Sequence, residues 1–224
     1  MTDASHRPAS GLRPPGAFPT LYPIIDVDLC GMRGLAPAAV AAAFLHGGAR
    51  LLQVRQKGSA GGSQQLLTAI RNIVSAAHAR EARVIVNDRA DLTLLSGADG
   101  VHVGQQDLPA AVVRRMLGPG AIIGVSTHSP EQVDEALAGP ADYIAVGPVF
   151  NTSTKDTGYT ARGLDLVRAA AGRRKPVVAI GGVTLENAGS VLAAGASSFA
   201  IISDLLSDAD PEARVRLYLD RLQR

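Results

Sequence analysis

Short apolar, β-branched runs alternate along the chain with longer stretches in which apolar residues recur at helical spacing. The short runs predict strands over 21–26, 51–54, 84–86, 100–103, 122–125, 143–146, 177–180 and 198–202. The longer stretches predict helices over 37–46, 63–80, 90–95, 109–117, 130–138, 164–171, 187–194 and 211–222. Ser129 is the candidate N-cap of one of these helices. Residues 1–19, rich in Pro, Gly, Ser and Arg, predict a flexible N-terminal tail.

Strands that alternate with helices favour parallel pairing through right-handed crossovers. Eight such units over 20–224 predict an α/β protein with a single (β/α)8 TIM barrel as its catalytic domain. A doubly wound open sheet is the alternative. It is disfavoured because the sequence lacks both the dinucleotide-binding glycine pattern after the first strand and the phosphate-binding P-loop pattern.

Polar residues stand where the predicted strands end, which is where such barrels build their active sites. Gln53, Arg55 and Lys57 follow the second strand and share one face, because side chains alternate along a strand. Two converging cations suit an anion, and Lys155, in the loop after the sixth strand, adds a third charge. A basic, solvated strand end is the alternative for the first group.

Asp88 and Asp107 follow adjacent strands, and two close carboxylates repel unless a proton or a metal lies between them. Mg²⁺ takes one or two carboxylates together with waters and phosphate oxygens, so the pair predicts a Mg²⁺ site. The alternatives are a helix N-cap for Asp88 and a turn residue for Asp107.

Loops after the seventh and eighth strands form the usual phosphate cradle of this architecture. Gly181-Gly182 and Ile202-Ser203 occupy these positions, although a glycine pair alone indicates only a tight turn. Asp204 is unfavourable beside a phosphate unless it points away or caps the next turn.

The histidines are less informative. We interpret His102 as a satisfied interior residue and His128 as either a loop residue or a proton carrier. His46 and His78 fit helix surfaces, and no histidine or cysteine spacing resembles a zinc site.

Composition narrows the class of protein. Hydrophobic residues make up 46% of the 224, tryptophan is absent, and mean hydropathy is +0.14, so the core is expected to be aliphatic. A net charge of +2 argues against a nucleic-acid partner. The lone Cys30 cannot form an intramolecular disulfide. With no membrane-length apolar run and no signal-peptide pattern, we expect a cytoplasmic protein without a membrane partner.

Taken in order, several motifs between Leu21 and the C-terminus resemble the thiamine-phosphate synthase family. They are Gln53-x-Arg55-x-Lys57, Asn87-Asp88-Arg89, Asp99-Gly100-Val101-His102-Val103-Gly104-Gln105-x-Asp107, Gly147-Pro148-Val149-Phe150-x-Thr152-x-Thr154-Lys155, Ile180-Gly181-Gly182 and Ile202-Ser203.

This resemblance implies a transferase that joins 4-amino-2-methyl-5-(diphosphooxymethyl)pyrimidine to a thiazole ethyl phosphate, carboxylated or not, and releases diphosphate. It implies that the pyrimidine diphosphate is held by Gln53, Arg55, Lys57, Asn87, Ser126 and Lys155, of which Arg55, Ser126 and Lys155 are the catalytic candidates. It implies that the thiazole phosphate is held by Thr152, Thr154, Gly182, Ile202 and Ser203, and Mg²⁺ by Asp88 and Asp107.

Two alternatives stay open at this point. A related thiazole tautomerase would rely on a histidine and would need no pair of metal-binding carboxylates. A non-catalytic binder of phosphate ligands would not release diphosphate. Self-association into a homo-oligomer is also left open.

Overall fold

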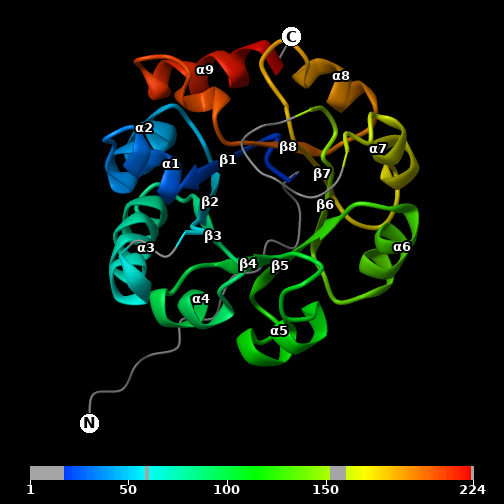
Figure 1. Cartoon of the computed structure of the whole chain (residues 1–224), viewed down its shortest axis with the longest axis horizontal. Helices are drawn as coiled ribbons and strands as arrows, with labels where there is room; N and C mark the ends of the chain where they lie inside the picture. The colour runs from blue at the N-terminus through cyan, green and yellow to red at the C-terminus, as the bar shows by residue number, and fades with distance from the viewer. Residues whose placement is uncertain (1–17, 59–60, 152–159, 223–224) are drawn as a thin grey trace.

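The eight predicted strands form one closed barrel of parallel strands. In this computed structural model each strand pairs with its neighbours in chain order, and β8 pairs with β1 to close the ring (Figure 1). The structure describes residues 18–58, 61–151 and 160–222; residues 1–17 of the predicted tail lie outside this part. The prediction of a single (β/α)8 barrel is confirmed.

The strands are β1 (Leu21–Asp26), β2 (Leu51–Arg55), β3 (Arg83–Asn87), β4 (Gly100–Val103), β5 (Ile122–Thr127), β6 (Tyr143–Val146), β7 (Val177–Ile180) and β8 (Ser198–Ile201). The helices are α1 (Val27–Met32), α2 (Pro37–His46), α3 (Gly62–His78), α4 (Ala90–Ser96), α5 (Ala110–Leu117), α6 (Pro130–Ala138), α7 (Asp165–Ala170), α8 (Ala188–Ala193), the 3-10 helix η1 (Asp204–Leu206) and α9 (Pro211–Leu222). Ser129 caps α6 as predicted, its hydroxyl accepting from the Gln132 N–H.

Two short helices were not predicted. The sequence between the first strand and Pro37 shows no helical apolar repeat, yet residues Val27–Met32 form α1. This helix begins because the Asp26 carboxylate accepts a hydrogen bond from the Leu29 N–H at 2.9 Å, as an N-cap side chain does. The other is η1, a single turn after β8. Such short helices are set by local caps and by packing, and periodicity does not reveal them.

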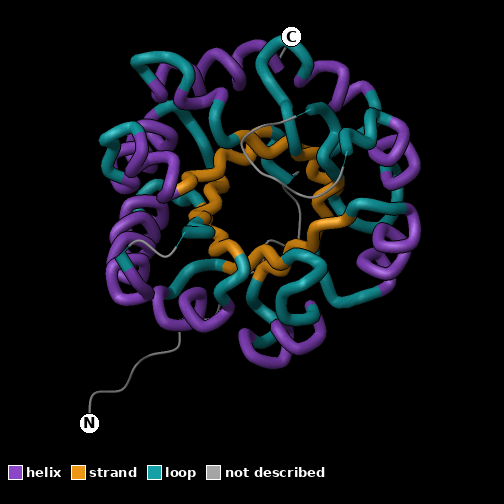
Figure 2. Tube along the Cα trace, viewed as in Figure 1, coloured by secondary structure: helices purple, strands orange, loops and turns teal. Residues whose placement is uncertain are grey.

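The core has two layers, inside and outside the strand ring, as Figure 2 shows with helices encircling the strands. The outer layer is mainly aliphatic, and Cys30 is fully buried there. The barrel interior contains Tyr22, Ile24, Leu51, Ile85, Ile122, Tyr143, Ala145, Val178 and Ala200. Two tyrosines therefore lie inside a barrel that was expected to be aliphatic. Within the described residues, no helix has the length and hydrophobicity needed to span a membrane.

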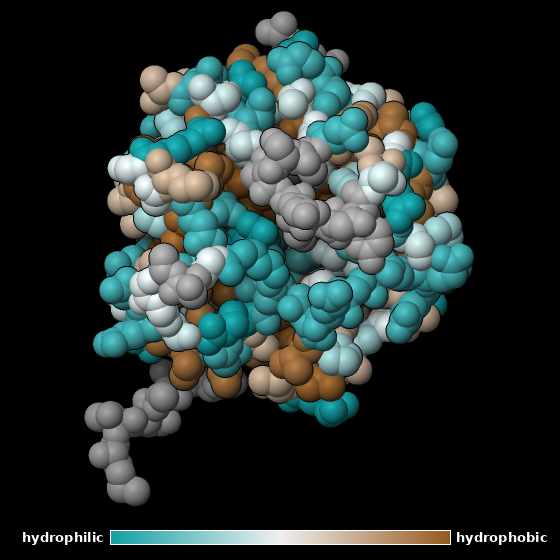
Figure 3. Space-filling view, in the orientation of Figure 1, coloured by the Kyte–Doolittle hydropathy of each residue, from teal (hydrophilic) through white to brown (hydrophobic). Residues whose placement is uncertain are grey.

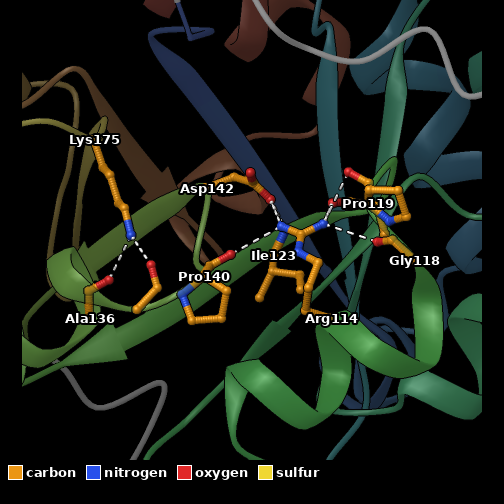
Figure 4. Close-up of polar contacts among 10 residues, drawn as sticks. Arg114, Gly118, Pro119, Ile123, Ala136, Pro140, Asp142 and Lys175 are labelled. Carbon is orange, nitrogen blue, oxygen red and sulfur yellow. Dashed lines mark hydrogen bonds and ion pairs between the residues drawn. The ribbon is translucent and has the colours of Figure 1, made fainter.

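One basic side chain, Arg114, connects the end of α5 to the loops that precede β5 and β6. Arg114 of α5 forms an ion pair with Asp142, whose carboxylate also accepts from the Ile123 N–H at 2.8 Å (Figure 4). Its two terminal nitrogens also donate to the backbone carbonyls of Gly118, Pro119, Ala121 and Pro140. Lys175 makes similar contacts with the carbonyls of Ala136 and Gly139. These cations satisfy carbonyls at the ends of α5 and α6 and in the loops that follow them.

We expect Arg114→Ala to lower the free energy of unfolding by about 2–3 kcal/mol, because carbonyls bound to a charged donor lose that donor. Urea unfolding followed by circular dichroism measures this change. Arg173→Ala is the matched control, because that arginine forms an exposed pair with Asp134 and should contribute about 1 kcal/mol or less. Equal losses in the two variants would contradict the role given to Arg114.

Candidate active site

The described members of the predicted site gather at the carboxyl ends of the strands and fall into two groups. Figure 3 presents this face of the barrel, where hydrophilic residues surround the centre. The first group, at the ends of β2 to β5 and in the loops that follow them, comprises Gln53, Arg55, Lys57, Asn87, Asp88, Asp107 and Ser126. The second, after β7 and β8, comprises Gly182, Ile202 and Ser203. Thr152, Thr154 and Lys155 lie outside the described residues.

The face shared by Gln53 and Arg55 points into the barrel mouth, as strand alternation predicts. Leu52 and Val54 pack in the outer layer beneath the helices instead. Only 3% of Gln53 and 8% of Arg55 is exposed, so a solvated strand end is the wrong interpretation for these two residues. Polar groups buried at this level require partners or a ligand.

Arg55 forms an ion pair with Asp26, the residue opposite it on β1. Because Asp26 also caps α1, one carboxylate orients the guanidinium and starts a helix. Asp26 was not predicted as a site residue, since it stands at the end of an apolar run and belongs to none of the motifs. The positive charge of Arg55 is thus balanced by the Asp26 carboxylate, and its planar guanidinium group is held in one orientation.

Two buried donors of the first group remain unsatisfied. Arg55 Nε and Asn87 Nδ2 are buried and have no hydrogen-bond partner within the described ranges. Buried polar atoms in native proteins nearly always find a partner. Two such atoms at neighbouring strand ends therefore fit a ligand that brings acceptor oxygens, as a diphosphate does.

Asp88 and Asp107 are close enough to influence each other. Burial raises the pKa of Asp88; the ion pair with Lys57 lowers it and the neighbouring Asp107 carboxylate raises it, so that the net shift is upward. Asp107 also accepts from the Gly104 N–H at 2.7 Å, the contact expected of the alternative in which it is a turn residue. Asp88 is not an N-cap, because Arg89 holds that position in α4.

These two carboxylates fit a divalent cation that takes most of its ligands from elsewhere. No cluster of three or more metal-ligating side chains occurs in the part of the chain that the structure describes. Mg²⁺ suits this donor set, because it keeps several waters and often binds substrate phosphates with only one or two carboxylates.

The second group surrounds a cavity of about 410 Å³. Its lining comprises Arg33, Ser126, His128, Gly147, Pro148, Asn151, Ile180, Gly181, Gly182, Val183, Thr184, Ala200, Ile201, Ile202, Ser203, Asp204 and Ser207. Gly182 has a φ of +64°, and a Cβ there would lie 2.4 Å from the Asn151 carbonyl oxygen. Asn187 holds the same loop through the Gly182 carbonyl and the Thr184 N–H. The loop thus presents backbone to the cavity, as a phosphate site requires.

Asp204 does not disturb this cavity with an unbalanced charge. Its carboxylate accepts from Arg214 at 2.8 Å and from the Tyr218 hydroxyl, both on α9. The alternative in which it caps the next turn is wrong, because Ser203 is at the N-cap of η1 and Asp204 makes no capping bond.

Arg33 is the one cationic side chain among the described residues that line the cavity. It follows α1, and its guanidinium also donates to the carbonyl of Leu206, the last residue of η1. Arg33 was not predicted as a site residue, because neither α1 nor η1 was predicted and nothing in the sequence brings these two segments together.

A chain of hydrogen bonds links the predicted ligands Gln53 and Ser126 through the barrel interior. Gln53 Nε2 lies 3.0 Å from the Tyr22 hydroxyl, which lies 3.0 Å from that of Tyr143. His102 Nδ1 lies 3.0 Å from the Tyr143 hydroxyl, and His102 Nε2 lies 2.8 Å from Ser126 Oγ. His102 is thus a satisfied interior residue, as predicted. Burial raises the pKa of both phenols, so each keeps its proton.

His128 serves as a loop residue in this structure. Its ring Nδ1 donates to the Gly147 carbonyl oxygen at 2.6 Å, which ties the loop after β5 to the loop after β6. His46 and His78 lie on helix surfaces as predicted, and each has a carboxylate partner, Glu212 and Asp99 respectively.

Comparisons with known proteins point to one family. Residues 21–205 match the family model described as thiamine monophosphate synthase. The chain is 46% identical over 181 residues to the thiamine-phosphate synthase of Anaeromyxobacter dehalogenans, covering 80% of each protein. It is 42% identical over 217 residues to that of Koribacter versatilis, covering 96% of this chain and 99% of the relative. The thiamine phosphate pyrophosphorylase from Pyrococcus furiosus superposes with a TM-score of 0.81 at 30% identity, over 91% of this chain and 95% of that one.

We expect Asp88→Asn to raise the melting temperature of the metal-free protein. The raised pKa means that the folded state disfavours the charged carboxylate, and a neutral amide removes that cost. Asparagine also tolerates the φ of +62° at this position. The gain should be about 2–4 °C for each kcal/mol relieved, measured by calorimetry.

The sign of this effect depends on pH. The cost is present only where the unfolded carboxyl is ionised, so the gain should be larger at about pH 7 than at about pH 4. Asp91→Asn is the control: the hydrogen bond from Arg89 lowers the pKa of Asp91, so its neutralisation should not stabilise the protein. A lower melting temperature for Asp88→Asn near neutral pH would show that the folded state does not disfavour the charged Asp88 carboxylate.

Proposed function

The chain belongs to the thiamine monophosphate synthase family, and we propose that the two residue groups at its barrel mouth hold the two substrates of that reaction. It is a transferase of thiamine biosynthesis. It condenses 4-amino-2-methyl-5-(diphosphooxymethyl)pyrimidine with a thiazole ethyl phosphate to give thiamine phosphate and diphosphate.

The chemistry requires stabilisation of a leaving group more than proton transfer. The bond between the pyrimidine methylene carbon and the diphosphate oxygen breaks, and the electron pair leaves with diphosphate. The electron-rich aminopyrimidine ring stabilises positive charge on that carbon, and the thiazole nitrogen forms the new C–N bond with its own lone pair. No general base is needed, in keeping with a site whose interior histidine already has both ring nitrogens engaged.

The pyrimidine diphosphate is assigned to the first group. The observation that carries this proposal is the pair of unsatisfied buried donors, Arg55 Nε and Asn87 Nδ2. Arg55, held by Asp26, then faces the diphosphate in a preset orientation, which lowers the reorganisation needed in the transition state. The assigned ligands are Gln53, Arg55, Lys57, Asn87, Ser126 and, by resemblance, Lys155.

The thiazole phosphate is assigned to the cavity of the second group. Gly182, Ile202 and Ser203 supply backbone and hydroxyl groups there, and by resemblance Thr152 and Thr154 complete the set. Ser126 lines this cavity and also ends the hydrogen-bonded chain that starts at Gln53. It therefore stands where the two substrates meet, and holding them in line supplies much of the rate enhancement.

Asp88 and Asp107 are proposed to hold Mg²⁺. The ion would neutralise charge that develops on the departing diphosphate. Lys57 now forms an ion pair with Asp88, so a cation already stands at the carboxylate that the metal would use. Substrate and metal together would let Lys57 exchange this carboxylate for a diphosphate oxygen.

Diphosphate release tests the reaction and the metal together. We expect release only when both substrates and Mg²⁺ are present, and none with EDTA. Asp107→Asn should lose most of this release, because the carboxylate that binds the metal is gone. Asp165→Asn, an exposed change on α7, should behave as the wild type. Full release in EDTA would refute the metal site without refuting the reaction.

Arg33 is expected to attract the thiazole phosphate. Arg33→Ala should raise the KM for the thiazole phosphate roughly fivefold, since a partly exposed charge contributes about 1 kcal/mol. The KM for the pyrimidine diphosphate should stay constant. Arg216→Ala is the control, because that arginine pairs with Glu212 on α9 and does not line the cavity. An equal rise in both KM values would argue against a specific role for Arg33.

A further inference from the structure

The hydrogen-bonded chain through the barrel interior has one direction that gives both tyrosine hydroxyl hydrogens an acceptor. Gln53 Nε2 can only donate, so the Tyr22 oxygen accepts from it. The Tyr22 hydroxyl then donates to Tyr143, and the Tyr143 hydroxyl donates to His102 Nδ1. His102 must carry its proton on Nε2 and donate it to Ser126 Oγ. Any other order leaves the buried hydroxyl hydrogen of Tyr22 or Tyr143 without an acceptor in the chain, whereas this order leaves over only that of Ser126.

The end of the chain lies in the active site. Because Ser126 Oγ accepts from His102, its own hydrogen is directed elsewhere, and Ser126 lines the cavity at the barrel mouth. Ser126 therefore meets a ligand as a hydrogen-bond donor. With the opposite direction, its hydrogen would be engaged by His102 Nε2 and the ligand would meet only an acceptor.

One glycine, Gly124, leaves the space that this chain of hydrogen bonds requires. Gly124 of β5 lies between His102 on β4 and Tyr143 on β6, at the level where the three residues are in register. A Cβ on Gly124 would lie 2.1 Å from the Tyr143 ring and 2.4 Å from His102 Nδ1. Only glycine there lets the neighbouring side chains meet across the strand between them. The contact between Tyr143 and His102 therefore follows from strand pairing and not from the packing of a loop.

We propose that Tyr22, Tyr143 and His102 are positioning residues, which hold His102 as its Nε2–H tautomer and thereby commit the Ser126 hydroxyl to donate to the substrate. This inference rests on the proposed function for the nature of the substrate. The acceptor is an oxygen or ring nitrogen of the pyrimidine diphosphate. None of the three positioning residues needs to touch the substrate, since they act through Ser126.

The first test reads the tautomer directly. In protein labelled with ¹⁵N-histidine, two-bond ¹H–¹⁵N correlation spectra distinguish Nε2–H from Nδ1–H, and the His102→Gln variant identifies the signals. We expect Nε2–H in the wild-type protein, and a shift toward Nδ1–H in Tyr143→Phe, which has lost the donor to Nδ1. An Nδ1–H signal in the wild type would overturn the proposal.

The second test asks whether Tyr143 acts through Ser126. Tyr143→Phe should lower kcat on the order of tenfold, about the effect of one hydrogen bond in the transition state. In a Ser126→Ala background the same change should lower kcat less than twofold, because the group that it positions is absent. Equal losses in the two backgrounds would mean that Tyr143 serves the fold alone.

Ser198→Ala controls for the loss of a buried hydroxyl. Ser198 lies on β8 and bonds the Thr20 carbonyl at 3.1 Å, away from the barrel mouth. It should leave kcat and the His102 tautomer unchanged in both backgrounds. If the wild-type protein forms no thiamine phosphate, the proposed function fails, whereas the tautomer measurement still decides the direction of the chain.

Discussion

The site depends on the parallel closure of the barrel. Because all eight strands run in one direction, every carboxyl end opens at one mouth, and residues far apart in sequence become neighbours there. Asp26 reaches Arg55 across β1 and β2, and Ser126 reaches His102 across β4 and β5. A helix or loop change elsewhere leaves these pairs in place, whereas a shift of register by one residue would turn each of them to the opposite face.

Charge at the mouth is balanced before any substrate arrives. Arg55 pairs with Asp26 and Lys57 with Asp88, so the cations that should meet a diphosphate already have carboxylate partners. The two pairs differ in their consequence. Asp26 also caps a helix and stays in place, whereas Asp88 also faces Asp107 and is the better placed to exchange its lysine for a metal. One pair thus orients a side chain, and the other can change partner when ligands bind.

The fold and much of the site could be predicted from the sequence. Strand and helix periods repeat clearly enough to count eight units, and the polar residues at strand ends lie on the faces that alternation predicts. Residues whose roles depend on unpredicted elements were missed. Asp26 and Arg33 flank α1, a helix of six residues with no apolar repeat. Asp204 finds Arg214 and Tyr218 on α9, a pairing that no local pattern encodes.

The interior tyrosines were missed for a different reason. In a strand a tyrosine fits an apolar pattern, because its ring is hydrophobic and only its hydroxyl needs a partner. Whether Tyr143 packs as an inert core residue or joins a polar chain depends on Gly124, one strand away, and on His102, two strands away. Register brings the three together, and register follows from the closed barrel. The closed barrel that brings the mouth residues together therefore also places the hydrogen-bonded chain beneath them. The same contacts set both the packing of the core and the direction of the hydrogen bond at Ser126.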